Sequence, residues 1–218
     1  MSTFTFKHKL GFTMLELVMV IVVLGILAAL ALPRMERDHK QEAADHILSQ
    51  IRYTQHLALN DDVHNNTNPQ WQRAFWQIGF GTCAGNSGLY EYIGSDKNYG
   101  GGINNNEAAI DPTNNKIMIW TGADCSNGGD GTSSENIFLT KKYGVTAIDT
   151  TACNNRAHIG FDHLGRPHQS FGASNTPDYA SYLSAVCTLK FTLSSGETFR
   201  ISIQPETGYA QIVGQNDS

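Results

Sequence analysis

The chain enters an apolar run with the stretch Lys9-Leu10-Gly11-Phe12-Thr13-Met14-Leu15-Glu16-Leu17, and the run continues to Leu32. From Phe12 to Leu32 it has 21 residues, of which Glu16 alone is charged. At about 1.5 Å per residue, a helix of this length just crosses a hydrocarbon layer of roughly 30 Å. A carboxylate at the bilayer centre costs about 2.5–3.5 kcal/mol, and less near the interface. The sequence therefore predicts a transmembrane helix in which a further interaction of Glu16 offsets the free-energy cost of placing its carboxylate in the bilayer.

This stretch resembles the class III signal of type IV pilins and pseudopilins. The resemblance covers about Lys9 to Pro33, and it rests on the Gly-Phe-Thr-x-x-Glu core, the Val/Ile/Leu run, Gly25 and the closing Pro33. It implies that a membrane-embedded prepilin peptidase cuts after Gly11 and N-methylates Phe12. It also implies that Glu16 pairs with the Phe12 amine of a neighbouring subunit. Since an ion pair in a low dielectric depends strongly on geometry, this pair can set the register between subunits.

Two other interpretations of the run fit less well. A secretory signal peptide has an apolar region of about 7–15 residues with a small-residue cleavage site behind it. Here the run is longer, and the small residues Ala28, Ala29 and Ala31 lie within it. An ordinary single-pass anchor fits the length, but it gives no reason for Glu16.

The position of the basic residues predicts the topology. Lys7 and Lys9 directly precede the run, and basic residues beside a span favour the cytoplasmic side. This places the leader inside, and the chain after Pro33 outside, a bacterial inner membrane. We therefore expect a leader at 1–11, a transmembrane helix and assembly segment at 12–33, and an exported globular domain at 34–218.

The exported part is acidic. From Gln41 onward it has ten Lys and Arg against seventeen Asp and Glu, a net charge of −7. This argues against tight binding to DNA phosphates, which depends on clustered cations, although a local basic strip around Lys141, Lys142 and Arg156 stays open. The sequence has no nucleophile elbow, phosphate loop or His-Glu-x-x-His motif, so we expect neither an enzyme nor a cofactor.

The chain past Pro33 predicts a helix and then strands. Apolar residues at helical spacing predict a continuing amphipathic helix over about Arg34–Asn60. Pro33 and Gly25 indicate either a simple kink or a stretch that loosens when the subunit enters a fibre. Period-two alternation then predicts strands around these pairs and runs: Trp76–Phe80, Ile117 and Ile119, Ile137 and Leu139, Cys187–Leu193, Phe199–Ile203 and Tyr209–Val213.

The last three strands are separated by short turns and read as an antiparallel meander. The predicted fold is therefore α+β and pilin-like: a long N-terminal helix, half transmembrane and half amphipathic, packed on an antiparallel sheet. Three strings also resemble the FimT and general secretion protein H group of minor pilins: Ile47–Leu59, Ile159–Pro167, and Ile203-x-Pro-Glu-Thr-Gly-Tyr. This resemblance implies a minor pilin or minor pseudopilin.

Four cysteines lie in the exported part, and none forms a Cys-x-x-Cys pair. An oxidising periplasm favours two disulfides among three possible connectivities. We favour Cys83–Cys125 and Cys153–Cys187, because each pair closes one loop-rich segment. Four reduced, buried thiols are the alternative.

A Gly- and Asn-rich region at about 81–134 predicts a long surface-loop insertion, which either carries contact specificity or is functionally silent. Its segments Asp111–Asn115 and Asp124–Asp130 offer oxygen ligands of the type that calcium prefers, but neither matches an EF-hand. His158, His163 and His168 could converge on a metal, or they are exposed polar residues of a turn. The sequence favours no resident metal.

The expected function is structural. The resemblance implies a filament subunit whose partners are the prepilin peptidase, other pilin or pseudopilin subunits, an inner-membrane assembly platform and the lipid bilayer. Three roles stay open: a subunit of a type IV pilus, a type II secretion pseudopilin, and a DNA receptor in DNA uptake, against which the acidic exported domain weighs.

Overall fold

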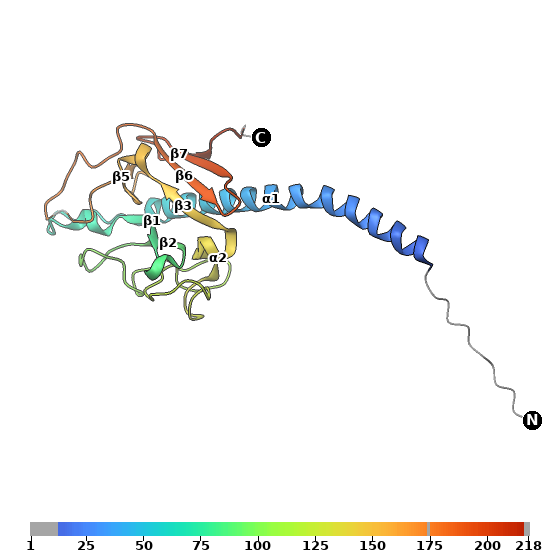
Figure 1. The fold of residues 1–218 in the computed structure, drawn as a ribbon. Helices are drawn as coiled ribbons and strands as arrows, with labels where there is room; N and C mark the ends of the chain where they lie inside the picture. The colour runs from blue at the N-terminus through green and yellow to red at the C-terminus, as the bar shows by residue number, and fades with distance from the viewer. Residues whose placement is uncertain (1–12, 174, 216–218) are drawn as a thin grey trace, which may run out of the picture. The chain divides into compact units, whose positions relative to one another are not determined.

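The computed structural model describes residues 13–173 and 175–215, with the backbone alone described for residues 28–38 and 86. The chain divides into two units, Met1–Asp38 and His39–Ser218, and the second is called the head below. Helix α1 (Met14–Leu59) runs through both units (Figure 1). The predicted continuation of the helix past Pro33 is therefore confirmed, whereas the kink at Pro33 stays a prediction.

In the head, the buried face of α1 follows the apolar spacing of the sequence. The buried residues are Ala43, Ala44, Ile47, Ile51, Thr54 and Ala58. The five apolar ones belong to one core with the inward side chains of both sheets. Burial of this stripe, rather than helix propensity alone, holds such a helix in place.

Two four-stranded sheets, with all paired strands antiparallel, form the rest of the head (Figure 1). The first sheet has the order β2 (Leu89–Gly94), β1 (Trp76–Thr82), β4 (His158–Phe161), β5 (Pro167–His168). The second has the order β3 (Val145–Asp149), β6 (Cys187–Leu193), β7 (Thr198–Ile203), β8 (Ala210–Ile212). The fold is α+β, as predicted, with two sheets in place of one.

The predicted C-terminal meander is confirmed. Strands β6, β7 and β8 pair in sequence, with Leu189 opposite Ile201 and Phe191 opposite Phe199. The rings of Phe191 and Phe199 stack with centroids 5.1 Å apart. Such cross-strand aromatic pairs stabilise a sheet and fix its register.

Two of the predicted strands are wrong. Ile117 forms only isolated bridges, with Ile110 and Ser133. The segment around Ile137 and Leu139 is helical, with a 3-10 turn at Glu135–Ile137 followed by α2 (Leu139–Tyr143). The side chain of Ser134 accepts a hydrogen bond from the Asn136 N–H and caps this turn. A serine cap outweighs an alternation of only two apolar residues.

Strand β2 lies inside the region expected to be an insertion of loops, and it pairs with β1 over its whole length. Its alternation was masked because the inward residue between Leu89 and Ile93 is the acid Glu91. The described part of the head also has three further 3-10 turns, at Trp71–Ala74, Ala84–Asn86 and Thr151–Cys153.

Two turns noted in the sequence meet on one side chain of α1. The Gln55 amide donates hydrogen bonds to the Gly165 carbonyl and to the Thr207 carbonyl, both at 2.9 Å. The first turn joins β4 to β5, and the second joins β7 to β8. Gln55 thus ties a turn of each sheet to the helix.

We expect Gly208→Ala to destabilise the head by about 2–4 kcal/mol, since it adds positive-φ strain to a steric overlap. Gly208 has φ +66°, and a Cβ there would overlap the Gly165 carbonyl oxygen and the Gln55 amide. Gly196→Ala is the matched control, because Gly196 has φ +86° with open space around it and should lose only about 1–2 kcal/mol. Thermal unfolding of the two variants measures the difference. Equal losses of stability would mean that the contact of Gly208 with Gly165 and Gln55 is not tightly packed.

Two disulfides join Cys83 to Cys125 and Cys153 to Cys187, the pairs that the sequence favours. The Cα–Cα distances are 5.9 Å and 4.4 Å. The first ties the end of β1 to the loop that contains Cys125, and the second ties the Thr151–Cys153 turn to the start of β6. The structure thus contains no reduced cysteine among its described residues.

Replacing both Cys153 and Cys187 by alanine should lower the free energy of unfolding by about 2–4 kcal/mol, because the bond closes a long loop in the unfolded chain. Peptide mapping without reduction should recover the same two pairs. A fragment that links Cys83 to Cys153, or free thiols in the native protein, would contradict the assignment.

Candidate assembly segment

The described start of α1 has a side-chain cap. The Glu16 N–H donates to the Thr13 hydroxyl at 3.3 Å, and the Leu17 N–H donates to the Thr13 carbonyl at 3.1 Å. Thr13 and Glu16 have the spacing of a capping box, and an acid in the first turn is favoured by the helix dipole. Thr13 therefore has a role that the sequence analysis missed, although the Thr-x-x-Glu pattern could have indicated it.

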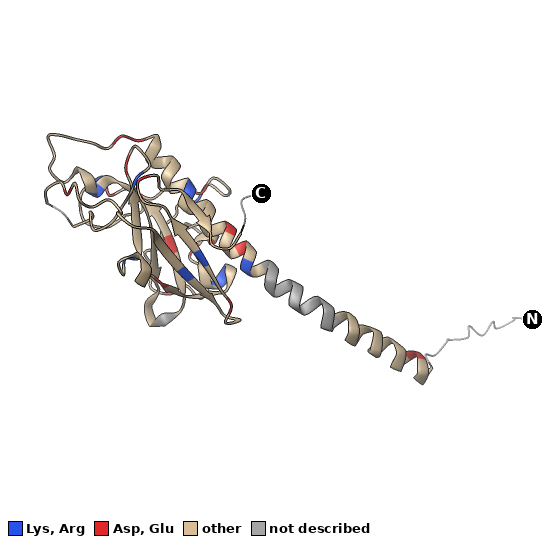
Figure 2. Cartoon of the chain, turned by 90° about the horizontal axis from the view of Figure 1, so that it is seen from above, with Lys and Arg blue, Asp and Glu red and all other residues tan. Residues whose placement is uncertain are grey.

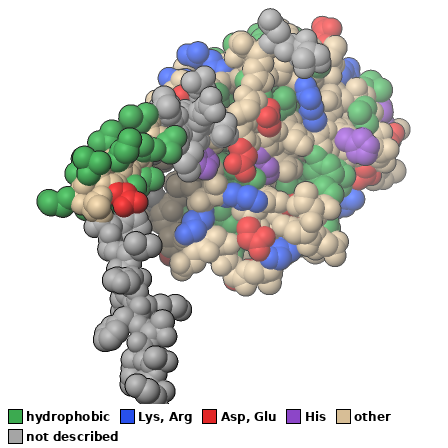
Figure 3. Space-filling view, turned by 90° about the vertical axis from the view of Figure 1, so that its right-hand side faces the viewer, with side chains coloured by type: hydrophobic (Ala, Val, Ile, Leu, Met, Phe, Trp, Pro, Cys, Tyr) green, Lys and Arg blue, Asp and Glu red, His purple; other side chains and the backbone are tan. Residues whose placement is uncertain are grey.

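Large apolar side chains surround the first described turns of α1. They are exposed by 47–87 %: Met14, Leu15, Leu17, Val18, Met19, Val20, Ile21, Val22, Val23, Leu24, Ile26 and Leu27. Figure 3 shows these side chains around an acidic group, and Figure 2 shows no other charge in the part of this unit whose side chains are described. A helix that is apolar all round is stable only when a membrane or other helices cover it.

The residues predicted for processing and for the kink are only partly within the described chain. Gly11 and Phe12 lie outside it, as does the side chain of Pro33. Gly25 is helical, and apart from its chain neighbours and the backbone of its own helix no described atom lies within 4 Å of the position that a Cβ would take. Within the described part of the chain, no helix is both long enough and apolar enough to cross a membrane.

The three histidines considered as metal ligands have separate partners. The His158 ring packs edge-on against Phe171 at 5.7 Å, and His163 lies 3.6 Å from an Asp62 oxygen. His168 is buried and contacts the Ser181 hydroxyl at 2.8 Å and the Asp162 carboxylate at 3.3 Å. Among the described residues, no group of three or more His, Cys, Asp or Glu side chains has the arrangement of a metal site.

Asp162 organises the turn between β4 and β5. Its carboxylate accepts from the Leu164 and Arg166 N–H groups at 3.0 and 2.9 Å and pairs with the Arg166 guanidinium at 2.7 Å. Burial acts to raise the pKa of Asp162, but hydrogen bonds from His168 and Arg166 outweigh it and hold the pKa well below its usual range. The Gly-Arg-Pro string noted in the sequence is therefore a structural turn.

The two segments considered for calcium use their carboxylates internally. The buried Asp111 accepts from the Thr113 N–H at 2.8 Å, from the Ser134 hydroxyl at 2.5 Å and from the Asn136 amide at 2.7 Å. Asp124 and Asp130 each accept from the residue two positions on, Ser126 and Thr132. These are local turn contacts of Asp side chains.

The sequence analysis did not predict a buried pair between His46 of α1 and Glu91 of β2. Glu91 has no exposed surface, and one carboxylate oxygen lies 2.7 Å from His46 Nε2, while the other has no hydrogen-bond partner among the described residues. The His46 ring stacks on Tyr143 at 4.4 Å. Burial raises the pKa of Glu91, against the lowering effect of His46. A sequence signal existed, since Glu91 stands at an inward position between two apolar residues.

Charges of both signs are interspersed on the face of the head seen in Figure 3. Lys141 and Lys142 lie in the last turn of α2, whereas Arg156 lies in the loop between the Thr151–Cys153 turn and β4. The basic strip considered from the sequence therefore draws on two separate elements.

Residues 6–32 match the family model of the prokaryotic N-terminal methylation motif. No curated protein and no solved structure matches the chain. The match leaves the resemblance to FimT and general secretion protein H unconfirmed. The chain carries the class III signal at its N-terminus, which supports its identification as a type IV pilin or pseudopilin.

Proposed function

We propose that this protein is a structural subunit, a minor pilin or pseudopilin, of a type IV pilus-like filament. One observation carries the proposal: the methylation motif at residues 6–32 overlaps the first turns of α1, where the described large apolar side chains between Met14 and Leu27 are exposed. The motif supports processing by prepilin peptidase, with cleavage after Gly11 and methylation of Phe12. The resulting helix would be stored in the inner membrane, with the head in the periplasm.

Filament entry would exchange lipid for neighbouring helices around the same apolar surface. Both environments are apolar, so helix packing and the pairing of Glu16 with a neighbouring Phe12 amine would favour the filament. An ATP-driven assembly platform in the inner membrane would supply the work of extraction.

The test is to express the chain with a short epitope after Val213 and to shear filaments from the cells. Its presence in the sheared fraction, with a chain that begins at Phe12, supports the proposal. Retention of the whole population in the membrane would contradict it.

Deletion in the source bacterium then separates the two systems. Loss of surface pili indicates a pilus subunit, and loss of enzyme export with intact pili indicates a type II secretion pseudopilin. The DNA-receptor role has the acidic head against it. Absence of a DNA mobility shift at low salt, where phosphate contacts are strongest, would remove it.

A further inference from the structure

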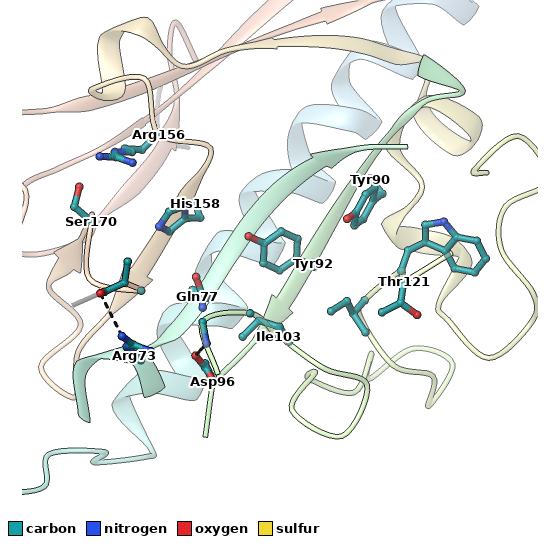
Figure 4. Close-up of a pocket in the computed structure, with 16 residues that line it drawn as sticks. Arg73, Gln77, Tyr90, Tyr92, Asp96, Ile103, Thr121, Arg156, His158 and Ser170 are labelled. Carbon is teal, nitrogen blue, oxygen red and sulfur yellow. Dashed lines mark hydrogen bonds between the residues drawn. The ribbon is translucent and has the colours of Figure 1, made fainter. Parts of the chain in front are cut away.

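A cleft of about 700 Å³ lies over the outer face of the first sheet (Figure 4). This face carries Gln77, Tyr90 and Tyr92, whereas Ile78 and Ile93 of the same strands point into the core. The volume of the cleft lies in the range of small-ligand sites, about 300–1,000 Å³. The cleft belongs entirely to the head, so its occupant is independent of the filament proposal.

Two tyrosines of β2 form an aromatic floor. Tyr90 and Tyr92 lie opposite Gly81 and Gly79 of β1, and their ring centroids are 6.4 Å apart. A Cβ at either glycine would overlap the tyrosine ring beside it. The two glycines therefore let both rings lie across β1, as Figure 4 shows, rather than stand away from the sheet.

Trp120 adds a third aromatic side chain to the lining. Its ring packs against Phe138 at 5.5 Å, which holds it in place. Its Nε1–H is buried and has no hydrogen-bond partner among the described residues. Because this atom has no exposed surface, Trp120 offers a ligand its ring rather than its N–H.

The walls of the cleft are held by two charged side chains. The Arg73 guanidinium donates to the Tyr99 carbonyl at 2.7 Å and to the Ala173 carbonyl at 3.2 Å. Asp96 accepts from the Gly100 and Gly101 N–H groups at 2.9 and 2.7 Å. Arg73 and Asp96 thus hold in place the loops that contain Tyr99–Gly101 and Ala173.

The remaining charge is at one end of the cleft. Arg156 is exposed, and its guanidinium forms no ion pair or hydrogen bond with any described residue. Beside it lie His158 and Ser170 (Figure 4). Burial and the nearby Arg156 lower the pKa of His158, which keeps its imidazole neutral at pH 7. This end therefore offers one free cation and two neutral hydrogen-bonding groups.

We propose that this cleft binds an oligosaccharide that carries a carboxylate. Sugar rings present flat C–H faces, which pack on aromatic rings, and hydroxyl edges, which bond to polar side chains. Tyr90, Tyr92 and Trp120 supply the first contact, while the two tyrosine hydroxyls and Gln77 supply the second. Arg156 takes the carboxylate, for which a guanidinium is the best-matched partner.

The same observations disfavour two other occupants. A single-stranded nucleic acid needs a cationic groove along its backbone, and the lining has one uncommitted cation. A peptide added to the sheet needs a free strand edge. The outer edge of β2 is already bonded, because the Leu89 N–H donates to the Thr140 hydroxyl and the Ile93 N–H donates to the Met118 carbonyl.

The experiment titrates the mature full-length protein in detergent with 3′-sialyllactose and with tri-galacturonic acid, followed by NMR of the sugar. The methyl esters of the same two sugars are the neutral counterparts, and a thymidine oligonucleotide and an unstructured peptide are the rival ligands. We expect saturable binding of at least one acidic sugar, and about tenfold weaker binding of its neutral counterpart.

Variants locate the site. Tyr92→Ala should weaken binding of the acidic sugar at least about tenfold, and Arg156→Gln should remove the preference for the acidic sugar over the neutral one. The controls are Tyr179→Ala and Arg200→Gln, exposed residues that do not line the cleft and should leave binding unchanged. Because Tyr92→Ala could disturb the sheet, Arg156→Gln on the surface keeps the test independent of folding. The proposal is overturned if neither acidic sugar binds, if the cleft variants bind like wild type, or if only the oligonucleotide or the peptide binds.

Discussion

Glu16→Ala should leave the protein in the membrane and nearly abolish its entry into filaments. The substitution removes the one charge of the apolar segment, so membrane insertion becomes easier by part of the roughly 2.5–3.5 kcal/mol that a central carboxylate costs. It also removes the proposed partner of the neighbouring Phe12 amine and leaves that amine unpaired in an apolar bundle. Breaking a buried pair from one side typically costs about 3–5 kcal/mol, which corresponds to at least a hundredfold loss of incorporation.

The measurement is the ratio of sheared to membrane-bound protein. Glu42→Ala is the matched control, because Glu42 lies on the same helix, is exposed and should not matter. Glu16 also stands at the capping position of the first turn, so Glu16→Gln separates the two roles. Glutamine keeps the capping-box geometry but has no charge. Normal incorporation of Glu16→Gln would mean that the acid acts as a helix cap and not as a register element.

His46→Leu should destabilise the head by about 3–5 kcal/mol, because it leaves a buried carboxylate without a partner. Glu91 has no exposed surface, and His46 contacts its carboxylate at 2.7 Å. Replacing both residues, in His46→Leu/Glu91→Leu, should restore stability to near the wild-type value or above it, since apolar pairs often replace buried ion pairs without loss. Chemical denaturation of both variants measures this difference.

The pH dependence follows from the direction of the pKa shift. Because burial raises the pKa of Glu91, the folded state binds the proton more tightly than the unfolded chain does. Stability therefore falls as pH rises from the unfolded pKa, about 4.3, through the raised folded pKa. His46→Leu should thus lose less stability at pH 4 than at pH 8, and the double variant should show no such difference. A loss that is independent of pH would assign the effect to the stacking of His46 on Tyr143.

Long, regular patterns predicted their elements correctly. The helix through Ile47 and Ile51 follows from many apolar residues at helical spacing, and the meander from Cys187 to Ile212 follows from sustained alternation between clear turns. The strands predicted around Ile117 and Ile137 were wrong. Two apolar residues in alternation indicate that both side chains are buried, but they do not indicate a strand. Strand β2 was missed because Glu91 occupies a core position, which only its contact with a distant histidine of α1 makes tolerable.

The functional residues likewise fall into a group that the sequence could predict and a group that it could not. Roles for Gly11, Phe12 and Glu16 could be predicted because the signal is contiguous in sequence, and these roles stay predictions. The cleft could not be predicted, because it joins residues from Arg73 to Ala173 that become neighbours only when β1, β2 and β4 pair. Gly79 and Gly81 of β1, which the sequence analysis did not single out, make room for the two tyrosine rings of the cleft.

The most direct test of the central claim is the intact mass of the protein purified from its native membrane, with fragmentation from the N-terminus. Processing of the methylation motif predicts a chain that begins at Phe12 and is heavier by one methyl group. The same spectrum, with and without reduction, counts the disulfides, which should be the two found here. A chain that still begins at Met1 and carries no methyl group would contradict the account of this protein as a filament subunit.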